Sequence, residues 1–297
     1  MTSTSNPNIS GPFGANLDAV LAKARGENFP VASRLLPAEM RGHLLAVYGF
    51  ARLADDIGDE YVGDRLVALD QLEAELDLVF AGRQSLHPVM ERLAVSVHEV
   101  GLDRQPFADL IEANRIDQRV DRYRTFAELL GYCELSANPV GRLVLQVFGA
   151  DTPDRRHLSD SVCSGLQVVE HIQDIGEDHA RGRIYVPLDD LARAGCPESD
   201  LGADQASTPL RQVVRLEVER ARGLLAAGDQ LVSSLDGRAR LAVTGFVAGG
   251  RAALDAVERA RHDVLGVRCR PTRRRLVGRG LGVWMAARRS VMPAGAP

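Results

Sequence analysis

Hydrophobic positions in this chain recur at roughly the 3.6-residue period of an amphipathic α-helix, and strand-like alternation is almost absent. The first predicted helix begins at Pro37, since proline suits a first helical turn, and Leu44, Tyr48, Ala51 and Asp55 then share one stripe. Further helices are predicted over residues 64–81, 88–100, 104–121, 126–148, 155–179, 208–234, 238–263 and 272–288. The chain is therefore predicted to be all-α.

Glycine and proline breaks separate the predicted helices, and no stretch has the composition of a linker between domains. We expect a single-domain helical bundle over residues 17–290, an architecture whose core often holds metal or ligand sites. Residues 1–16 are rich in Ser, Thr, Asn, Gly and Pro and are expected to form a disordered leader, with residues 291–297 as a flexible tail.

Composition excludes several other classes of protein. The 297 residues are 45% hydrophobic, which suffices for a large core, and the net charge of −4 argues against a general nucleic-acid binder. No apolar run approaches the roughly 18–20 residues of a membrane span. The four cysteines lack a C-x-x-C pair and indicate reduced thiols in the cytoplasm. No Walker loop, G-x-G-x-x-G, H-E-x-x-H or G-x-S-x-G motif is present.

Two acidic clusters carry the clearest chemistry. Asp55 and Asp59 lie four residues apart, as do Asp174 and Asp178, so each pair shares one helix face. Like charges at this spacing repel by a few tenths of a kcal/mol, so stability gives no reason for them. Mg²⁺ commonly binds one or two carboxylates together with water and substrate phosphate. Two such patches would clamp a diphosphate if they faced each other across a bundle.

Each acidic cluster also has a simpler interpretation. Asp55 continues the apolar stripe, where a carboxylate must be paired, metal-bound or neutralised, and Arg52 is either its ion-pair partner or a phosphate ligand. The alternative is an acidic helix end in solvent. The second cluster lies on a polar stripe, which is usually a solvated face. That stripe consists of Gln167, Glu170, His171, Asp174 and Asp178.

Residues around the second cluster add to the case for an anionic ligand. Arg181, Arg183 and Tyr185 follow it and offer cations and a phenol. We expect His171 to be a polar neighbour and not a metal ligand, because a hard, oxygen-rich site does not need imidazole.

Two further segments each leave two interpretations open. The small residues of segment 132–141 indicate either close helix packing or a wall beside an apolar tunnel, and Pro139 should kink the helix there. The C-terminal arginines indicate either a solvated helix or a peripheral contact with anionic lipid at the inner membrane face. These arginines are Arg268, Arg270, Arg273, Arg274, Arg275 and Arg279.

From residue 28 to about residue 275, the sequence resembles the squalene/phytoene synthase family. The most specific matches are Y-G-F-A-R-L-A-D-D-I-G-D-E at residues 48–60 and the segment 173–187. Within the family, E-N-F-P-V-A-S, S-A-N-P-V-G and D-D-I-G-D-E look most like the hydroxysqualene synthase branch of hopanoid biosynthesis.

The resemblance implies an isoprenoid synthase fold with a central cavity, and several Mg²⁺ ions that bind a substrate diphosphate. The implied metal residues are Asp55, Asp59, Asp174 and Asp178, with Glu170 added because it stands where the family usually has Asn. This carboxylate would either bind metal directly or orient a water. The implied catalytic residues are Tyr48, Arg52, Tyr132, Arg183 and Tyr185. The implied substrate-binding residues are Phe29, Ser136, Ala137, Gly141 and Gln167.

The activity implied by the resemblance is conversion of presqualene diphosphate to hydroxysqualene by ionisation, rearrangement and water capture, without NADPH, alongside other hopanoid enzymes. Three alternatives stay open. One is a sister reaction: NADPH-dependent squalene synthesis, or condensation of farnesyl or geranylgeranyl diphosphate. Another is a prenyl elongase or terpene cyclase, because residues 55–59 satisfy D-D-x-x-D. The last is a non-catalytic lipid-binding helical subunit.

Overall fold

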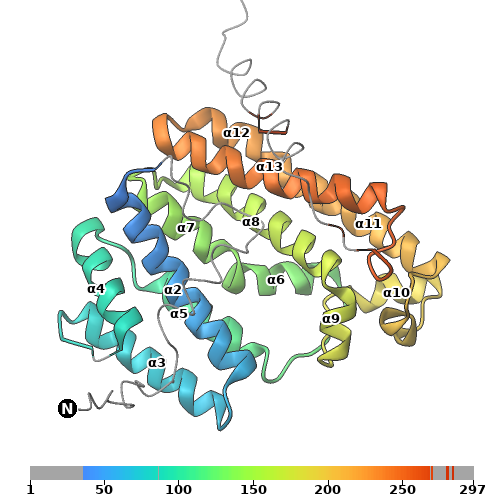
Figure 1. Cartoon of the computed structure of the whole chain (residues 1–297), viewed down its shortest axis with the longest axis horizontal. Coiled ribbons are helices and arrows are strands. Elements are labelled where there is room, and N and C mark those ends of the chain that lie inside the picture. Colours follow the sequence, from blue (N-terminus) through green and yellow to red (C-terminus); the bar gives the residue numbers. More distant parts are fainter. Residues whose placement is uncertain (1–35, 86, 268, 270–278, 281–282, 284–297) are drawn as a thin grey trace, which may run out of the picture. The chain divides into compact units, whose positions relative to one another are not determined.

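A computed structural model describes residues 36–85, 87–267, 269, 279–280 and 283 (Figure 1). Helices form its regular structure. Within these residues no strand occurs, and β-type pairing is limited to an isolated bridge between Arg122 and Ile184. The prediction of an all-α protein is confirmed.

The chain forms two compact units, which we describe separately. Unit 1 contains the described residues up to Gln118, and unit 2 contains those from Arg119 onward. The predicted leader, tail and domain limits at residues 17 and 290 fall outside the described residues and stay predictions.

Unit 1 is built around its first helix, α2, which contacts each of the other three helices. Phe50 of α2 is fully buried and meets Phe107 of α5 edge-on, with 5.0 Å between ring centroids. Such edge-to-face pairs add to the gain from burying apolar surface. The four helices are α2 (Ala38–Glu60), α3 (Arg65–Phe80), α4 (Pro88–Val100) and α5 (Gln105–Ile116).

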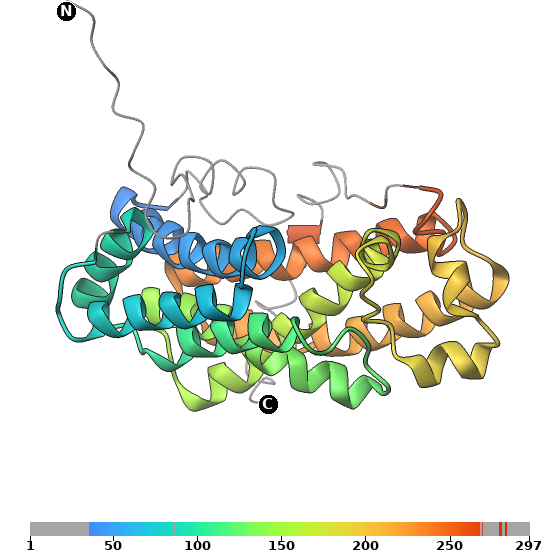
Figure 2. The same cartoon turned by 90° about the horizontal axis from the view of Figure 1, so that it is seen from below.

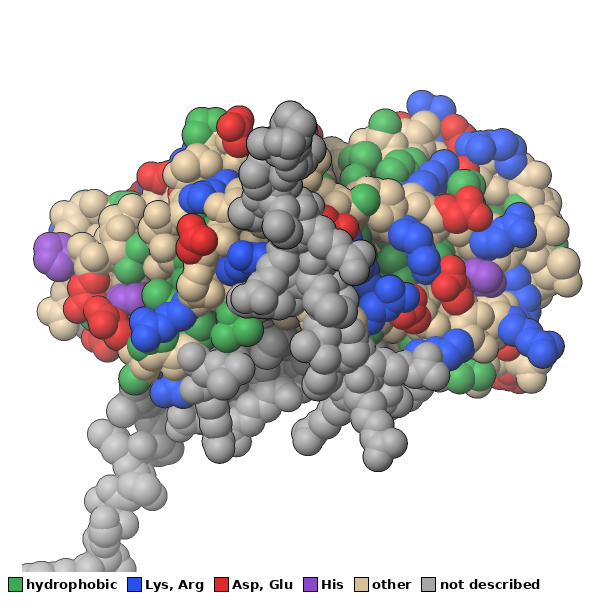
Figure 3. Space-filling model, turned by 90° about the horizontal axis from the view of Figure 1, so that it is seen from above, with side chains coloured by type: hydrophobic (Ala, Val, Ile, Leu, Met, Phe, Trp, Pro, Cys, Tyr) green, Lys and Arg blue, Asp and Glu red, His purple; other side chains and the backbone are tan. Residues whose placement is uncertain are grey.

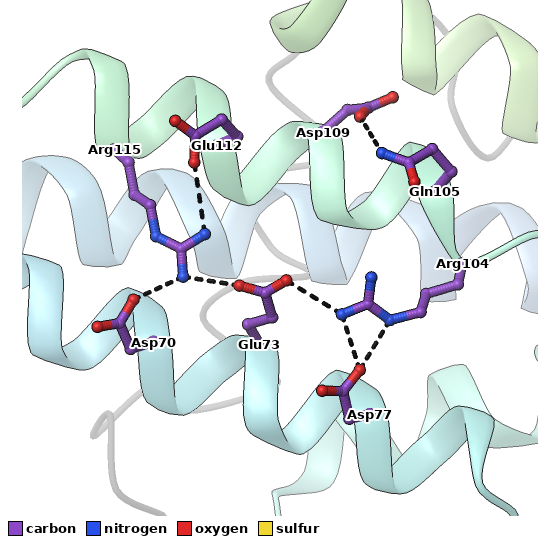
Figure 4. Close-up of polar contacts among 8 residues, drawn as sticks. All are labelled: Asp70, Glu73, Asp77, Arg104, Gln105, Asp109, Glu112 and Arg115. Carbon is purple, nitrogen blue, oxygen red and sulfur yellow. Dashed lines mark hydrogen bonds and ion pairs between the residues drawn. The ribbon is translucent and has the colours of Figure 1, made fainter.

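A row of ion pairs ties α5 to α3 (Figure 4). The α3 carboxylates Asp70, Glu73 and Asp77 share one face because they are three and four residues apart. Glu73 accepts from Arg104 at 3.0 Å and from Arg115 at 2.8 Å. Arg115 also donates to Asp70 at 2.6 Å, and Arg104 to Asp77 at 2.7 Å. The shared Glu73 makes this a network, which holds α5 in a fixed register on α3.

Unit 2 is centred on α8, which contacts α6, α7, α11, α12 and α13 (Figures 1 and 2). The buried side chains of α8 include Val162, Val168, Val169 and Ile172, which form its apolar face. The elements of unit 2 are α6 (Phe126–Ser136), α7 (Asn138–Val147), α8 (Pro153–Gln173), α9 (Ile175–Ala180), α10 (Leu188–Ala194), the 3₁₀ helix η1 (Glu198–Gly202), α11 (Thr208–Leu225), α12 (Ala227–Ser234) and α13 (Gly237–Arg259).

Three of the predicted helices are each divided in two. The break at Ala137 confirms the predicted interruption of the helix. Pro139 lies in the first turn of α7, where its missing N–H leaves no helical hydrogen bond unmade. The predicted helix 155–179 breaks at Asp174, whose φ of −106° and ψ of 11° leave the helical region. The predicted helix 208–234 divides between α11 and α12 at Ala226.

The small-residue segment provides close packing of α7 on α8. A Cβ placed on Gly141 would overlap Cys163 Sγ and would lie 2.5 Å from Ser159 Oγ. Only glycine leaves room for this approach. For Gly141, the packing interpretation is confirmed.

Three observations on the described residues concern the predicted contact of the C-terminal arginines with anionic lipid. None of the described helices is both long enough and apolar enough to cross a membrane. On the face seen in Figure 3, basic side chains lie interspersed with acidic ones. Arg279 donates to Asp255 at 2.6 and 2.7 Å, so it is engaged within unit 2. The other C-terminal arginines lie outside the described residues, and their contact with lipid stays a prediction.

Candidate active site

The first acidic cluster lies at the C-terminal end of α2. Asp55 and Asp59 are both exposed, one helical turn apart. The expected stripe through Leu44 and Tyr48 runs along the edge of the buried face, because Leu44 is buried and Tyr48 only half-buried. Of the two interpretations of Asp55, the exposed helix end therefore agrees with the structure, and the inward-facing position does not.

Asp55 nevertheless has a perturbed ionisation. Reduced hydration among the surrounding protein atoms raises its pKa to about 6. The hydrogen bond from Asn114 and the charge of Arg52 oppose this increase in pKa. Repulsion from Asp59 and Asp117 adds to it. At neutral pH the carboxylate is mostly ionised, the state that binds a cation.

Asn114 of α5 positions Asp55. Its buried side-chain amide donates to Asp55 Oδ1 at 3.2 Å and to the carbonyl of Leu110 at 3.1 Å. Gly58 makes room for it, since a Cβ there would overlap Asn114 Oδ1 and lie 3.1 Å from Asn114 Cγ. Sequence reasoning missed Asn114. The available signal was a polar residue on the apolar stripe of Phe107 and Leu110.

Arg52 pairs with other carboxylates of the same helix. Its Nε lies 2.9 Å from Asp56, four residues later, and Nη2 lies 3.6 Å from Glu60. Arg52 was expected either to pair with Asp55 or to bind phosphate. Its ion pairs are instead with Asp56 and Glu60, and the i, i+4 spacing of the Asp56 pair suits a helix. Although burial opposes it, the charges of Asp56 and Asp55 raise the pKa of Arg52.

The second acidic cluster follows the end of α8. The Asp174 N–H donates to the Glu170 carbonyl at 2.9 Å, and the Asp178 N–H donates to the Asp174 carbonyl at 2.8 Å. These bonds keep the one-turn spacing across the break between α8 and α9, so the three carboxylates come from successive turns. Asp174 is exposed, whereas Glu170 and Asp178 are half-buried.

Three tyrosines and one histidine form an aromatic cluster in unit 2. The ring of Tyr185 stacks on His171 at 3.9 Å and on Tyr123 at 5.7 Å, and it lies tilted against Tyr132 at 5.7 Å. Sequence reasoning missed Tyr123, because no motif or helical periodicity around it indicates a place in the site. It reaches the cluster because its loop pairs with residues 183–185, where the Ile184 N–H donates to the Asp121 carbonyl at 2.8 Å.

His171 lies between this cluster and the second acidic cluster. It is buried, and loss of hydration lowers the pKa of its imidazole to about 3. Its Nε2 lies 3.2 Å from Gln167 Nε2, and its Nδ1 lies 4.0 Å from Asp178 Oδ2. A small cavity adjoins the His171 ring. Arg181, which the sequence offered as a second cation, is exposed and is not among the residues that line this cavity. The residues around this cavity are His171, Ile175, Asp178, Arg183, Ile184, Tyr185, Val186 and Leu201.

The predicted substrate residues are brought together only in part. Ser136 and Ala137 are half-buried at the break between α6 and α7. Ser136 Oγ is buried without a hydrogen-bond partner among the described residues. Gly141 packs against α8, and Phe29 lies outside the described residues. A substrate role for these residues stays a prediction.

The oxygen donors of both acidic clusters fit Mg²⁺, which prefers hard oxygen ligands and usually retains water and phosphate. Each cluster presents two aspartates on adjacent turns. Among the described residues, no group of three or more His, Cys, Asp or Glu side chains lies close enough together to bind a metal ion without other ligands. The arrangement suits an ion held by one or two carboxylates and completed by substrate oxygens.

Comparison with known sequences relates the chain to prenyl diphosphate enzymes. Residues 22–275 match the family described as squalene/phytoene synthase. A hydroxysqualene synthase of Sinorhizobium fredii is 37% identical over 228 residues, covering 75% of this chain and 76% of the relative. That of Zymomonas mobilis is 38% identical over 216 residues, covering 70% and 71%. A phytoene synthase of Arthrospira platensis is 32% identical over 257 residues, covering 82% and 83%.

Solved structures agree with this relationship. The squalene synthase HpnC of Alicyclobacillus acidocaldarius superposes with a TM-score of 0.74 at 41% identity, covering 83% of this chain and 95% of that one. A dehydrosqualene synthase gives a TM-score of 0.83 at 23% identity, covering 92% and 96%, and supports the fold alone. The predicted isoprenoid synthase type of helical fold is confirmed. The chain belongs to the squalene/phytoene synthase family and is an enzyme of that type.

Proposed function

We propose that this enzyme converts presqualene diphosphate to hydroxysqualene. The bond between carbon and diphosphate breaks, the cyclopropylcarbinyl cation rearranges, and a water oxygen bonds to the resulting cation and releases a proton. No electrons are gained or lost, so NADPH is not required. Relatives named hydroxysqualene synthase are 37–38% identical to this chain, against 31–32% for those named phytoene synthase.

One observation carries this proposal. In unit 2, Asp178 and Arg183 line the same small cavity as His171 and Tyr185. The guanidinium of Arg183, which can bind an anion, therefore lies around the same cavity as the rings of His171 and Tyr185. This combination suits a reaction that separates a diphosphate anion from a carbocation. Tyr185 is in turn stacked with Tyr123 and in tilted contact with Tyr132, which extends the aromatic surface.

Different residues would stabilise the diphosphate anion and the carbocation. Arg52 and Arg183 would bind diphosphate oxygens, because a guanidinium fork matches phosphate geometry. Bound Mg²⁺ would stabilise negative charge on the leaving diphosphate. The residues that would hold Mg²⁺ are Asp55, Asp59, Glu170, Asp174 and Asp178. The faces of Tyr48, Tyr132 and Tyr185 would stabilise the cation and exclude water until its capture.

A second candidate is reductive squalene synthesis. The 41% identity to a structure described as a squalene synthase favours it. Both reactions would begin with the same ionisation and would differ in whether water or hydride reaches the cation.

The test is incubation of the purified enzyme with presqualene diphosphate and Mg²⁺ in H₂¹⁸O, with and without NADPH, followed by mass spectrometry. We expect ¹⁸O-labelled hydroxysqualene in both reactions. Squalene formed only with NADPH would establish the second candidate. If neither appears, farnesyl, geranylgeranyl and isopentenyl diphosphates test the condensation and elongation reactions. Thermal stabilisation by Mg²⁺ and a diphosphate analogue without any product would indicate a non-catalytic subunit.

A further inference from the structure

We propose that His171 is a positioning residue that fixes Asp178 and Tyr185 relative to each other. This inference rests on the proposed function, in which Asp178 holds a metal ion and Tyr185 faces the cation. His171 contacts both: its Nδ1 edge faces Asp178 Oδ2 at 4.0 Å, and its ring face stacks on Tyr185 at 3.9 Å with 15° between the planes.

With the Gln167 amide in its assigned orientation, the contact with Gln167 assigns the proton of the His171 ring to one nitrogen. The Gln167 atom nearest to His171 Nε2, at 3.2 Å, is the amide nitrogen. An amide nitrogen donates and does not accept, so His171 Nε2 accepts. The proton of the neutral ring then resides on Nδ1, the atom that faces Asp178.

The Nδ1–H group therefore points its positive end toward the Asp178 carboxylate. At 4.0 Å this is an interaction of a charge with a dipole and is too long for a hydrogen bond. It favours one orientation of the carboxylate, and partners outside the first ligand shell that orient a ligand typically change metal affinity about 10–100-fold. His171 is buried, and the stack on Tyr185 holds the plane of its ring.

Histidine is suited to this position because it combines a flat face with two polar edges. Phenylalanine would keep the stack on Tyr185 and lose both edges. Asparagine would place an amide nitrogen near the position of Nδ1 and lose the ring. The two substitutions therefore separate the two contacts of His171.

The first experiment measures binding of inorganic diphosphate by calorimetry, with and without Mg²⁺, for the wild type, His171→Phe and His171→Asn. We expect His171→Phe to weaken Mg²⁺-dependent binding about 10-fold. Diphosphate binding by His171→Asn should stay within about threefold of the wild type. Its kcat should fall, because the Tyr185 ring loses its stack on His171 and keeps the one on Tyr123. The control is His157→Phe, on an exposed position of the same helix. Binding by His171→Phe equal to that of the wild type would overturn the proposal.

A second measurement needs no variant of the site. Selective ¹⁵N labelling of histidine in the wild type should show a neutral ring protonated at Nδ1, whose shifts change when Mg²⁺ and diphosphate are added. A His171 ring protonated at Nε2 would contradict the assignment. The diphosphate-binding and ¹⁵N measurements do not use presqualene diphosphate, so a wrong product assignment would leave both interpretable. Only the kcat of His171→Asn depends on the substrate. Absence of Mg²⁺-dependent diphosphate binding in the wild type would instead count against the proposed function.

Discussion

The side-chain amide of Asn114 donates to the carboxylate of Asp55 at 3.2 Å, linking α5 to the first acidic cluster. Asn114 is itself buried and has a second bond to the Leu110 carbonyl at 3.1 Å. This amide is thus fixed by its own helix and presents one N–H to Asp55. It stabilises the ionised carboxylate, which is the form that binds a cation.

We expect Asn114→Leu to move the acidic limb of the pH–activity profile to higher pH. The pKa of Asp55 is about 6, and the Asn114 hydrogen bond lowers it. Losing a bond of about 1 kcal/mol would raise the pKa by roughly half to one unit. Because the protonated carboxyl binds cations poorly, activity would then be lost at a higher pH. A profile of kcat/KM against pH measures this shift, and an unchanged acidic limb would exclude the proposed role of Asn114.

Gly58→Ala should destabilise the protein and reduce its activity together. The added methyl would collide with Asn114. Overpacking of this kind costs about 1–3 kcal/mol. The matched control is Gly42→Ala in the same helix, where no atom lies within 4 Å of the new Cβ. There we expect a gain of about 0.5–1 kcal/mol, because alanine suits a helix interior better than glycine. Thermal unfolding of both variants provides the comparison.

Asp55→Ala and Asp174→Ala should each lower kcat by roughly 100-fold or more, since each would lose a carboxylate that holds the metal at the leaving diphosphate. Far-ultraviolet circular dichroism should stay unchanged, because both side chains are exposed. Glu177→Ala is the control, since this exposed acidic residue lies in the second cluster without a proposed role. Substantial turnover by either aspartate variant would refute the metal assignment.

Glu217 should make the stability of the protein depend on pH. It is buried in α11, where loss of hydration raises its pKa to about 7, Asp190 adds to the increase and Arg220 opposes it. The folded state then binds a proton more tightly than the unfolded chain. The free energy of unfolding should therefore fall as pH rises from about 4.5 to about 7, by up to about 3 kcal/mol from this group.

The variant Glu217→Gln removes this titration. Chemical denaturation at a series of pH values should show that the wild type loses its stability relative to the variant across this interval. A constant difference between the two proteins from pH 4.5 to pH 7 would mean that Glu217 titrates normally.

The sequence by itself determined the properties that depend on local spacing. Helical periodicity predicted an all-α fold, and Pro139 predicted the interruption between α6 and α7. The pairs Asp55/Asp59 and Asp174/Asp178 keep their one-turn spacing in the structure, the second pair even across a helix break. These features could be predicted because a helix fixes the relation between residues three and four positions apart.

Tertiary structure alone decided which distant groups meet and how far each is exposed. Asn114 lies 59 residues from Asp55 in sequence, and no periodicity relates them. Tyr123 joins the aromatic cluster through its loop, and His171 gains its contacts only where α8 meets Tyr185. The periodicity of a helix indicates its apolar face but does not specify what lies against that face. Packing specifies this, and it thereby sets the pKa of Asp55 and the surroundings of His171.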